Sequence, residues 1–267
     1  MPALPKVVAA RGPFVNFRPK TVKPPFGAAQ IDWGHPLASN LAFAVILNEG
    51  VGTILFDLHG TRPRFQTGTP TWVVGDRGIM IRNPTSEFRE LSAHVPTQYG
   101  FSLHALTRAN SGNNGTLRAC VAVLDAALAG QALGWGSTTG IPTLRDQGTI
   151  VAGTAIGLNV WASLTGNFES STSRRIYVNG ILNVSNSTST TFGAKDRFAV
   201  GDETSIYDLL LALCYTRLLS PAEMLWLHTE PYAFLQPVPA VTYAFMRTPA
   251  APAAGVTPLR TLMGVGR

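Results

Sequence analysis

The chain has 267 residues, of which 45% are hydrophobic and 13% are charged, with 26 Gly and 19 Pro. This length suits one large β domain, and frequent Gly and Pro are typical of many short strands joined by tight turns. The composition argues against a helical bundle.

The net charge of +6 comes from the two ends of the chain. Residues 1–31 hold five Lys or Arg and no acid, and residues 231–267 hold three Arg and no acid, which leaves −2 for the middle. Stacking aromatics do not alternate with these charges, so the pattern favours arms that lie on an acidic protein surface over a nucleic-acid partner.

Residues 1–30 contain six prolines and follow neither the strand period nor the helix period. We therefore predict an extended basic arm over residues 1–30, a globular domain over residues 31–236 and a C-terminal extension over residues 237–267. Within the extension, only Val241–Phe245 has strand character. The arm also holds apolar residues, which indicates that it lies against its own domain or a neighbour. The predicted assembly residues of the arm are Arg11, Phe14, Phe17, Arg18, Lys20, Lys23 and Phe26.

The domain is expected to open with a hairpin. Leu41–Leu47 reads as a buried strand, residues 48–52 as a turn and Thr53–Leu58 as the next strand. Residues 101–108 then alternate in polarity, which places Ser102 and His104 on a polar face and predicts an exposed His104.

Short strands separated by Gly or Pro follow. Leu117–Asp125 fits a central strand, although Ala122–Ala129 fits a helix equally well by its apolar pattern. Four more segments then come at short intervals, a rhythm typical of a sandwich or jelly roll: Gln131–Gly136, Ile141–Arg145, Thr149–Ala152 and Asn159–Thr165.

The stretch from Arg174 to Pro231 carries the clearest local signals. Asn179-Gly180 predicts a two-residue hairpin turn, because both positions need positive φ. The polar run Asn183–Thr191 predicts a surface loop with an edge strand. Ser220, Pro221 and Glu223 predict a helix that opens with a capping box and ends at Pro231.

Four motifs stand in the order and spacing typical of one lectin family: Val160–Thr165 (VWASLT), Ile176–Gly180 (IYVNG), Ala199–Asp202 (AVGD) and Tyr215–Glu223 (YTRLLSPAE). The front half adds three more: His35–Ala38, Asn48–Thr53 and Asp57–Gly60. On these residues the chain resembles the laminin-G-like, concanavalin A-like lectin domain over roughly residues 31–230. The resemblance implies an all-β concanavalin A-like jelly-roll sandwich with one short helix near the C-terminus and extended terminal arms.

The subgroup that the chain is most similar to occurs in tailed-bacteriophage particle proteins, where the helix is followed by E-P-Y and an aromatic, here Glu230–Phe234. This likeness implies a virion structural protein made in the host cytoplasm and displayed as a capsid decoration, fibre or tail-associated component. Its partners would be other virion proteins, contacted through residues 1–30 and 237–267, and further copies in a homo-oligomer. A host surface glycan is the alternative partner.

One departure from the family concerns the penultimate strand. Leu209–Leu213 is wholly apolar where relatives often carry an acid. That strand should therefore be core or a hydrophobic contact surface, and the calcium site that some relatives use is in doubt. We expect no cofactor.

Candidate catalytic groups are sparse. Glu87, Glu90 and the Asp202-Glu203 pair lie in loop-like stretches, and no carboxylate pairing suited to a glycosidase is present. The five histidines lack metal-ligand spacing, and Cys120 and Cys214 sit in apolar runs that leave open whether they pair. We therefore predict a protein that is not an enzyme and holds no metal.

A sugar site needs an aromatic platform and a few hydrogen-bonding groups. Trp72, Trp135 and Trp161 are available, although core packing is the usual role of a Trp in a sandwich. Trp135 stands between two glycines and reads as the most loop-like, so Trp135 and Asp202 are the predicted ligand-binding residues. The apolar runs are too short to span a bilayer, and a membrane partner is not expected.

Three function classes follow in order of preference: the virion structural protein, a glycan-binding adhesin module and a polysaccharide-degrading enzyme.

Overall fold

The computed structural model describes residues 21–51, 55–59, 63–67, 71–82, 87–110, 117–136, 140–201 and 207–238. The predicted ligand residue Asp202, five of the arm residues and the predicted strand Val241–Phe245 lie outside these ranges. Those five arm residues are Arg11, Phe14, Phe17, Arg18 and Lys20.

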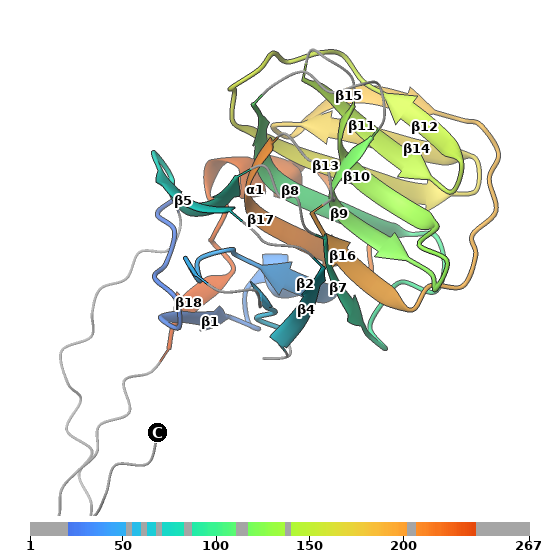
Figure 1. Ribbon diagram of the computed structural model, residues 1–267. Helices are drawn as coiled ribbons and strands as arrows, with labels where there is room; N and C mark the ends of the chain where they lie inside the picture. Colours follow the sequence, from blue (N-terminus) through green and yellow to red (C-terminus); the bar gives the residue numbers. More distant parts are fainter. Residues whose placement is uncertain are drawn as a thin grey trace, which may run out of the picture. The chain divides into compact units, whose positions relative to one another are not determined.

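Two antiparallel sheets dominate the described chain (Figure 1). The first sheet runs in the order β12 (Thr149–Ala152), β11 (Ile141–Asp146), β10 (Gly130–Gly136), β9 (Arg118–Leu124), β16 (Arg197–Val200), β7 (Glu87–Leu91), β4 (Pro63–Thr67) and β3 (Leu55–Phe56). The second runs β15 (Ile181–Asn186), β14 (Ser173–Val178), β13 (Ala162–Ser170), β8 (Phe101–Ala109), β17 (Tyr207–Tyr215), β6 (Gly78–Arg82) and β5 (Thr71–Gly75), and β2 (Leu41–Val45) also pairs with β17. The predicted all-β sandwich is confirmed.

The main core lies between the sheets and is built from the inward-facing residues of each strand. Phe43 of the second sheet stacks on Phe198 of the first with ring centroids 4.9 Å apart. Cys120 and Cys214 are buried as thiols in this core and are not joined by a disulfide. The segment that fitted either a strand or a helix is the strand β9, buried along most of its length.

The local signals near the C-terminal end are confirmed. Asn179 and Gly180 have φ of 53° and 81° and join β14 to β15, which lies at the edge of its sheet. The helix α1 (Pro221–Thr229) opens with a capping box in which Ser220 and Glu223 each bind the other's backbone N–H. The helices within the described ranges are all too short to span a bilayer.

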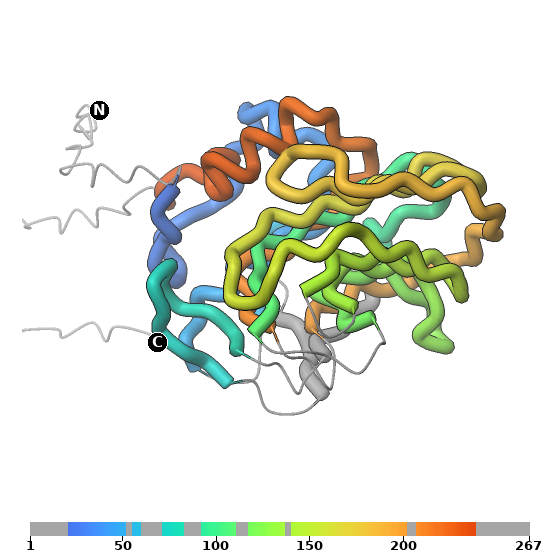
Figure 2. The backbone as a smooth tube through the Cα atoms, turned by 90° about the horizontal axis from the view of Figure 1, so that it is seen from above, coloured from blue at the N-terminus to red at the C-terminus, as the bar shows by residue number. Residues whose placement is uncertain are grey.

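A second core covers the outer face of the second sheet. Met224 and Leu227 of α1, together with Phe234, pack over Leu211 and Leu213 of β17. The short 3-10 helix η1 (Pro36–Ala38) and the two-stranded pair β1 (Ala29–Ile31) and β18 (Leu235–Pro237) complete this layer. Figure 2 shows α1 beside the N-terminal segment of the domain. Because both faces of β17 are buried, its sequence is apolar without alternation.

The predicted opening hairpin is wrong. β2 pairs with β17 in the second sheet, whereas β3 pairs with β4 in the first. The Asp57 carboxylate accepts a hydrogen bond from the Ala44 backbone N–H at 2.9 Å, so a side chain supplies what a strand partner would supply. The chain therefore crosses between the sheets where the sequence indicates a turn within one sheet.

The prediction of an exposed His104 is also wrong. Its side chain is buried between β8 and α1, where it forms a hydrogen bond of 2.9 Å with Thr165. Burial lowers the pKa of His104 to about 3, with a further contribution from His228 of α1. Alternating polarity marked two faces correctly, but the polar face is covered by the helix rather than by water.

Residues 21–30 pack onto the domain, which therefore begins before residue 31. The amine of Lys23 donates to the carbonyls of Leu47 and Ile79, and Asn48 Nδ2 donates to the Pro24 carbonyl at 2.9 Å. Lys23 is thus tied to its own domain rather than presented as an assembly contact. Phe26 is half exposed and touches Phe56 with ring centroids 5.3 Å apart.

Candidate functional site

The predicted ligand residue Trp135 is a core residue of β10. Its side chain is 2% exposed, and its Nε1 donates to Thr107 Oγ1 at 3.1 Å. The glycines that flank Trp135 are required by close packing between strands and do not mark a loop. A Cβ on Gly134 would lie 1.9 Å from the Arg118 carbonyl oxygen. A Cβ on Gly136 would lie 2.4 Å from Thr143 Oγ1. Trp135 therefore presents no ring face to a ligand.

The other two candidate tryptophans take different positions. Trp72 of β5 is half buried against the main core. Trp161 is half buried at the surface, and its Nε1 donates to the carboxylate of Asp76 at 3.1 Å.

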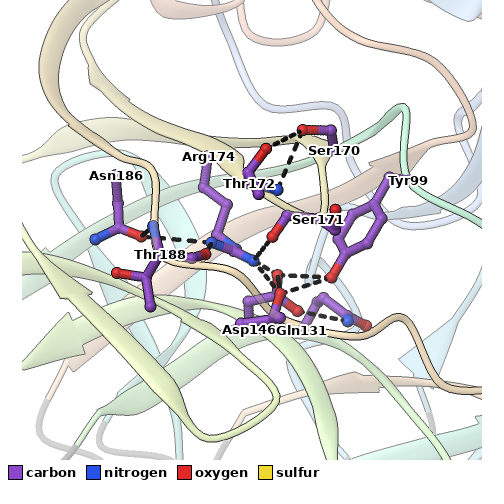
Figure 3. Close-up of polar contacts among 10 residues, drawn as sticks. Tyr99, Gln131, Asp146, Ser170, Ser171, Thr172, Arg174, Asn186 and Thr188 are labelled. Carbon is purple, nitrogen blue, oxygen red and sulfur yellow. Dashed lines mark hydrogen bonds and ion pairs between the residues drawn. The ribbon is translucent and has the colours of Figure 1, made fainter.

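A buried ion pair joins the two sheets at one end of the sandwich (Figure 3). Arg174 of β14 donates to Asp146 of β11, and both side chains are fully buried. Asp146 also accepts hydrogen bonds from Gln131 Nε2 at 2.8 Å, Tyr99 OH at 3.1 Å and Thr190 Oγ1 at 2.7 Å. Protein donors thus satisfy both carboxylate oxygens, and the cluster holds the loop around Thr190 against the sheets.

An open groove with an exposed tryptophan lies elsewhere. The groove has a volume of about 330 Å³. We define the Trp33 groove as Trp33 and the residues that line this cavity: Asn40, Leu41, Ala42, His59, Ala93, His94, Val95 and Thr216. Trp33 is 57% exposed and meets the ring of His59 edge-on with centroids 5.2 Å apart. His59 in turn lies 5.1 Å from the ring of His94.

Short side-chain turns present the aromatic residues of the groove. Asp32 Oδ1 accepts a hydrogen bond from the Gly34 backbone N–H at 3.0 Å, which shapes the turn that carries Trp33. Asp57 Oδ1 accepts one from the His59 backbone N–H at 3.1 Å. These turns are the kind that Asp favours, since its carboxylate reaches the backbone two residues ahead.

Asn40, another lining residue of the groove, has its backbone in the left-handed region. Asn40 has φ of 55°, and its carbonyl accepts a hydrogen bond from the Thr216 backbone N–H at 2.9 Å. Asn tolerates this conformation better than most residues. The Thr216 hydroxyl also donates to the Asn40 carbonyl at 3.4 Å, and both residues are exposed, one just before β2 and the other just after β17.

The described residues of the groove are polar and carry no fixed charge. They offer two imidazoles, one amide and one hydroxyl above an apolar floor, and none of them is Asp, Glu, Lys or Arg. Such groups can both donate and accept hydrogen bonds, and the exposed indole beside them offers an apolar face. This combination suits a neutral ligand rich in hydroxyl groups.

Sequence reasoning missed the groove because its residues are far apart along the chain. Trp33, His59 and His94 come from three separate turns, and each appears unremarkable in its own segment. The turn signal Asp-Trp-Gly at residues 32–34 was the one clue that this tryptophan is exposed. The described residues hold no cluster of three or more His, Cys, Asp or Glu side chains able to bind a metal.

Comparisons with known proteins identify the fold. No family model and no curated protein sequence matches the chain. Among solved structures, it is similar to Trypanosoma rangeli sialidase in complex with sialic acid, with a TM-score of 0.55 and 13% identity over 71% of this chain and 33% of that one. It is also similar to the binding domain of Paraclostridial Mosquitocidal Protein 1, with a TM-score of 0.54 and 17% identity over 71% and 52%. A third similar structure is the botulinum neurotoxin serotype G binding domain. Its TM-score is 0.52, and it is 14% identical over 71% of this chain and 50% of that one.

This chain aligns with about a third to a half of each of those chains. At these identities the likeness concerns the fold, a sheet-rich lectin-like jelly roll. The group includes both an enzyme and binding domains, so the fold alone does not assign an activity.

Proposed function

We propose that this chain is a carbohydrate-binding, lectin-like domain whose Trp33 groove holds a neutral sugar of a surface glycan. The observation that carries the proposal is the exposed indole of Trp33 beside the uncharged polar lining of the groove. The similar structures support a binding role, because two are binding domains and one is a sialidase in complex with sialic acid.

Each part of the groove meets a different part of the sugar. The indole face of Trp33 covers the apolar face of a pyranose ring, while Asn40, His94 and Thr216 exchange hydrogen bonds with its hydroxyls. A single open site of this kind binds weakly. A homo-oligomer, which we propose on the same ground, raises the avidity for a repeating glycan.

The test begins with a glycan array and follows each hit by NMR titration of the labelled domain. Binding should shift the Trp33 indole signal and saturate. Trp33→Ala should abolish binding, Trp33→Phe should retain part of it, and Ile150→Ala is the matched control because Ile150 is similarly exposed on β12. Hits that leave the Trp33 signal unmoved, or an array without hits, would refute this site.

We propose further that the domain does not cleave the glycan it binds. The described residues that line the Trp33 groove include no carboxylate, whereas glycosidases generally use a pair of them. Incubation with each array hit should release no reducing sugar, and release that is lost in Trp33→Ala would overturn this reading.

Display on a bacteriophage particle is our second functional proposal. It rests on the sequence resemblance at Glu230–Phe234 and on the charge of the two ends, and none of the structures named above bears on it. Deletion of residues 1–20 should leave a folded domain that no longer enters particles, because residues 21–30 already pack onto the domain. Unchanged incorporation of the deletion variant would contradict the proposal.

A further inference from the structure

A second pocket lies at the turn between β5 and β6. It has a volume of about 290 Å³, which is near the lower end for ligand sites and is of monosaccharide size. We call it the Arg77 pocket, lined by Thr21, Val22, Lys23, Asp76, Arg77, Gly78, Leu106, Pro231 and Tyr232. None of these described lining residues also lines the Trp33 groove.

The charges next to this pocket are paired in one connected network. The buried Asp208 carboxylate forms ion pairs with two arginines. Arg82 Nε lies 3.1 Å from Oδ1, and a guanidinium nitrogen of Arg108 lies 2.8 Å from Oδ2. The other guanidinium nitrogen of Arg108 lies 3.7 Å from Asp76 Oδ1. Asp76 is also held by the indole N–H of Trp161. Both carboxylates in the network therefore have cationic partners.

Arg77 lies beside this network but takes part in none of its ion pairs. Its side chain is exposed, and its guanidinium carbon lies 5.6 Å from the centre of the Trp161 ring. Among the described residues it forms no ion pair with an acid. Burial lowers the pKa of the neighbouring His228, and the charge of Arg77 lowers it further.

The remaining surfaces of the pocket suit the body of a small ligand. Val22 is 66% exposed and offers an apolar contact, whereas Leu106 and Pro231 are buried. The half-buried ring of Trp161 stands beside the guanidinium of Arg77. The amine of Lys23 is turned away, since it donates to the carbonyls of Leu47 and Ile79. Among the described residues that line the pocket, Arg77 is therefore the cation available to an anionic ligand.

We propose that the Arg77 pocket binds a carboxylate-bearing ligand of monosaccharide size, an acidic sugar. The carboxylate meets the Arg77 guanidinium, which can donate two parallel hydrogen bonds to it. The sugar ring lies against Val22, the exposed apolar side chain of the lining. This site is separate from the Trp33 groove and does not require the neutral-sugar proposal to be right.

The experiment compares glucuronate, glucose and acetate as probes by NMR titration of the chain. Glucuronate should shift the signals of Arg77 and of the Trp161 indole, whereas glucose and acetate should do so only at much higher concentration. Arg77→Gln should weaken glucuronate binding by about tenfold or more, as expected for loss of a charged contact. Arg175→Gln removes the same charge from an exposed site on β14 and should leave binding unchanged.

Three results would overturn the proposal. Equal binding of glucose would show that the carboxylate is not recognised, and equal binding of acetate would show that the sugar is not. An equal loss in Arg175→Gln would reveal a general effect of net charge. Trp33→Ala should leave glucuronate binding intact, so the failure of one site is distinguishable from the failure of the other.

Discussion

Gly180, in the turn between β14 and β15, lies directly against the backbone of Leu225 in α1. A Cβ at Gly180 would stand 2.7 Å from the Leu225 Cα, and the residue also has φ of 81°. The hairpin and the helix therefore meet at a position where both the conformation and the space require glycine.

Gly180→Ala should lower the free energy of unfolding by about 2 kcal/mol or more, because it adds a steric clash to the cost of a positive φ. Gly27→Ala is the matched control, since Gly27 has φ of 71° but no heavy atom within 4 Å of the added Cβ. Urea denaturation of both variants separates the two costs. Equal losses would show that the contact with α1 contributes nothing.

The burial of His104 predicts a loss of stability in acid. Its pKa is lowered to about 3 in the folded state, whereas an exposed histidine titrates near pH 6.5. Between these values the unfolded chain binds more protons, so the free energy of unfolding falls by up to about 1.4 kcal/mol for each pH unit below 6.5. The contribution of His104 is fully present above pH 6.5.

Denaturation curves between pH 7 and pH 4 measure this slope. His104→Gln keeps a polar side chain beside Thr165 but does not titrate, so its slope should be shallower. The same slope in both proteins would assign the pH dependence to other groups.

Removing one partner of the ion pair between Arg174 and Asp146 should destabilise the fold strongly. Arg174→Met leaves a buried carboxylate without its cation and should cost about 3–5 kcal/mol. The double variant with Asp146→Asn should cost less than the sum of the two single changes, because the unpaired charge is then gone. Denaturation of the four proteins in this cycle measures the coupling, and additive losses would contradict it.

Trp135 should matter for stability and not for binding. Trp135→Ala removes a buried indole and its hydrogen bond to Thr107, and should cost about 3–5 kcal/mol. Trp135→Phe keeps most of the volume and should bind glycans like the parent chain. A selective loss of glycan binding by a stably folded Trp135→Phe would restore the predicted platform role.

Local sequence signals predicted the parts of the fold whose causes are local. Asn179-Gly180 and the capping box at Ser220 specify a turn and a helix start through contacts within a few residues, and both are present. The partner of β2 depends instead on Asp57, which reaches across to Ala44. The polarity of His104 likewise gave its face of the strand, but not the helix that covers that face.

The candidate sites were hidden for the same reason. Trp135 reads as a loop residue because glycines flank it, yet the neighbouring strands approach too closely for any side chain at those positions. Trp33 and His94 become neighbours of one groove only when the sheets pack. Arg77 is recognisable as an uncompensated charge only after Asp76 and Asp208 are seen to be paired.

The pairing of β1 with β18 sets the mechanical behaviour of the domain. Ala29 lies opposite Pro237, and Val238 donates its backbone N–H to the Ala28 carbonyl at 3.0 Å. A force applied between residues 28 and 238 acts on adjacent points at one end of a two-stranded ladder. We expect that force to break these hydrogen bonds one after another before it loads the two large sheets.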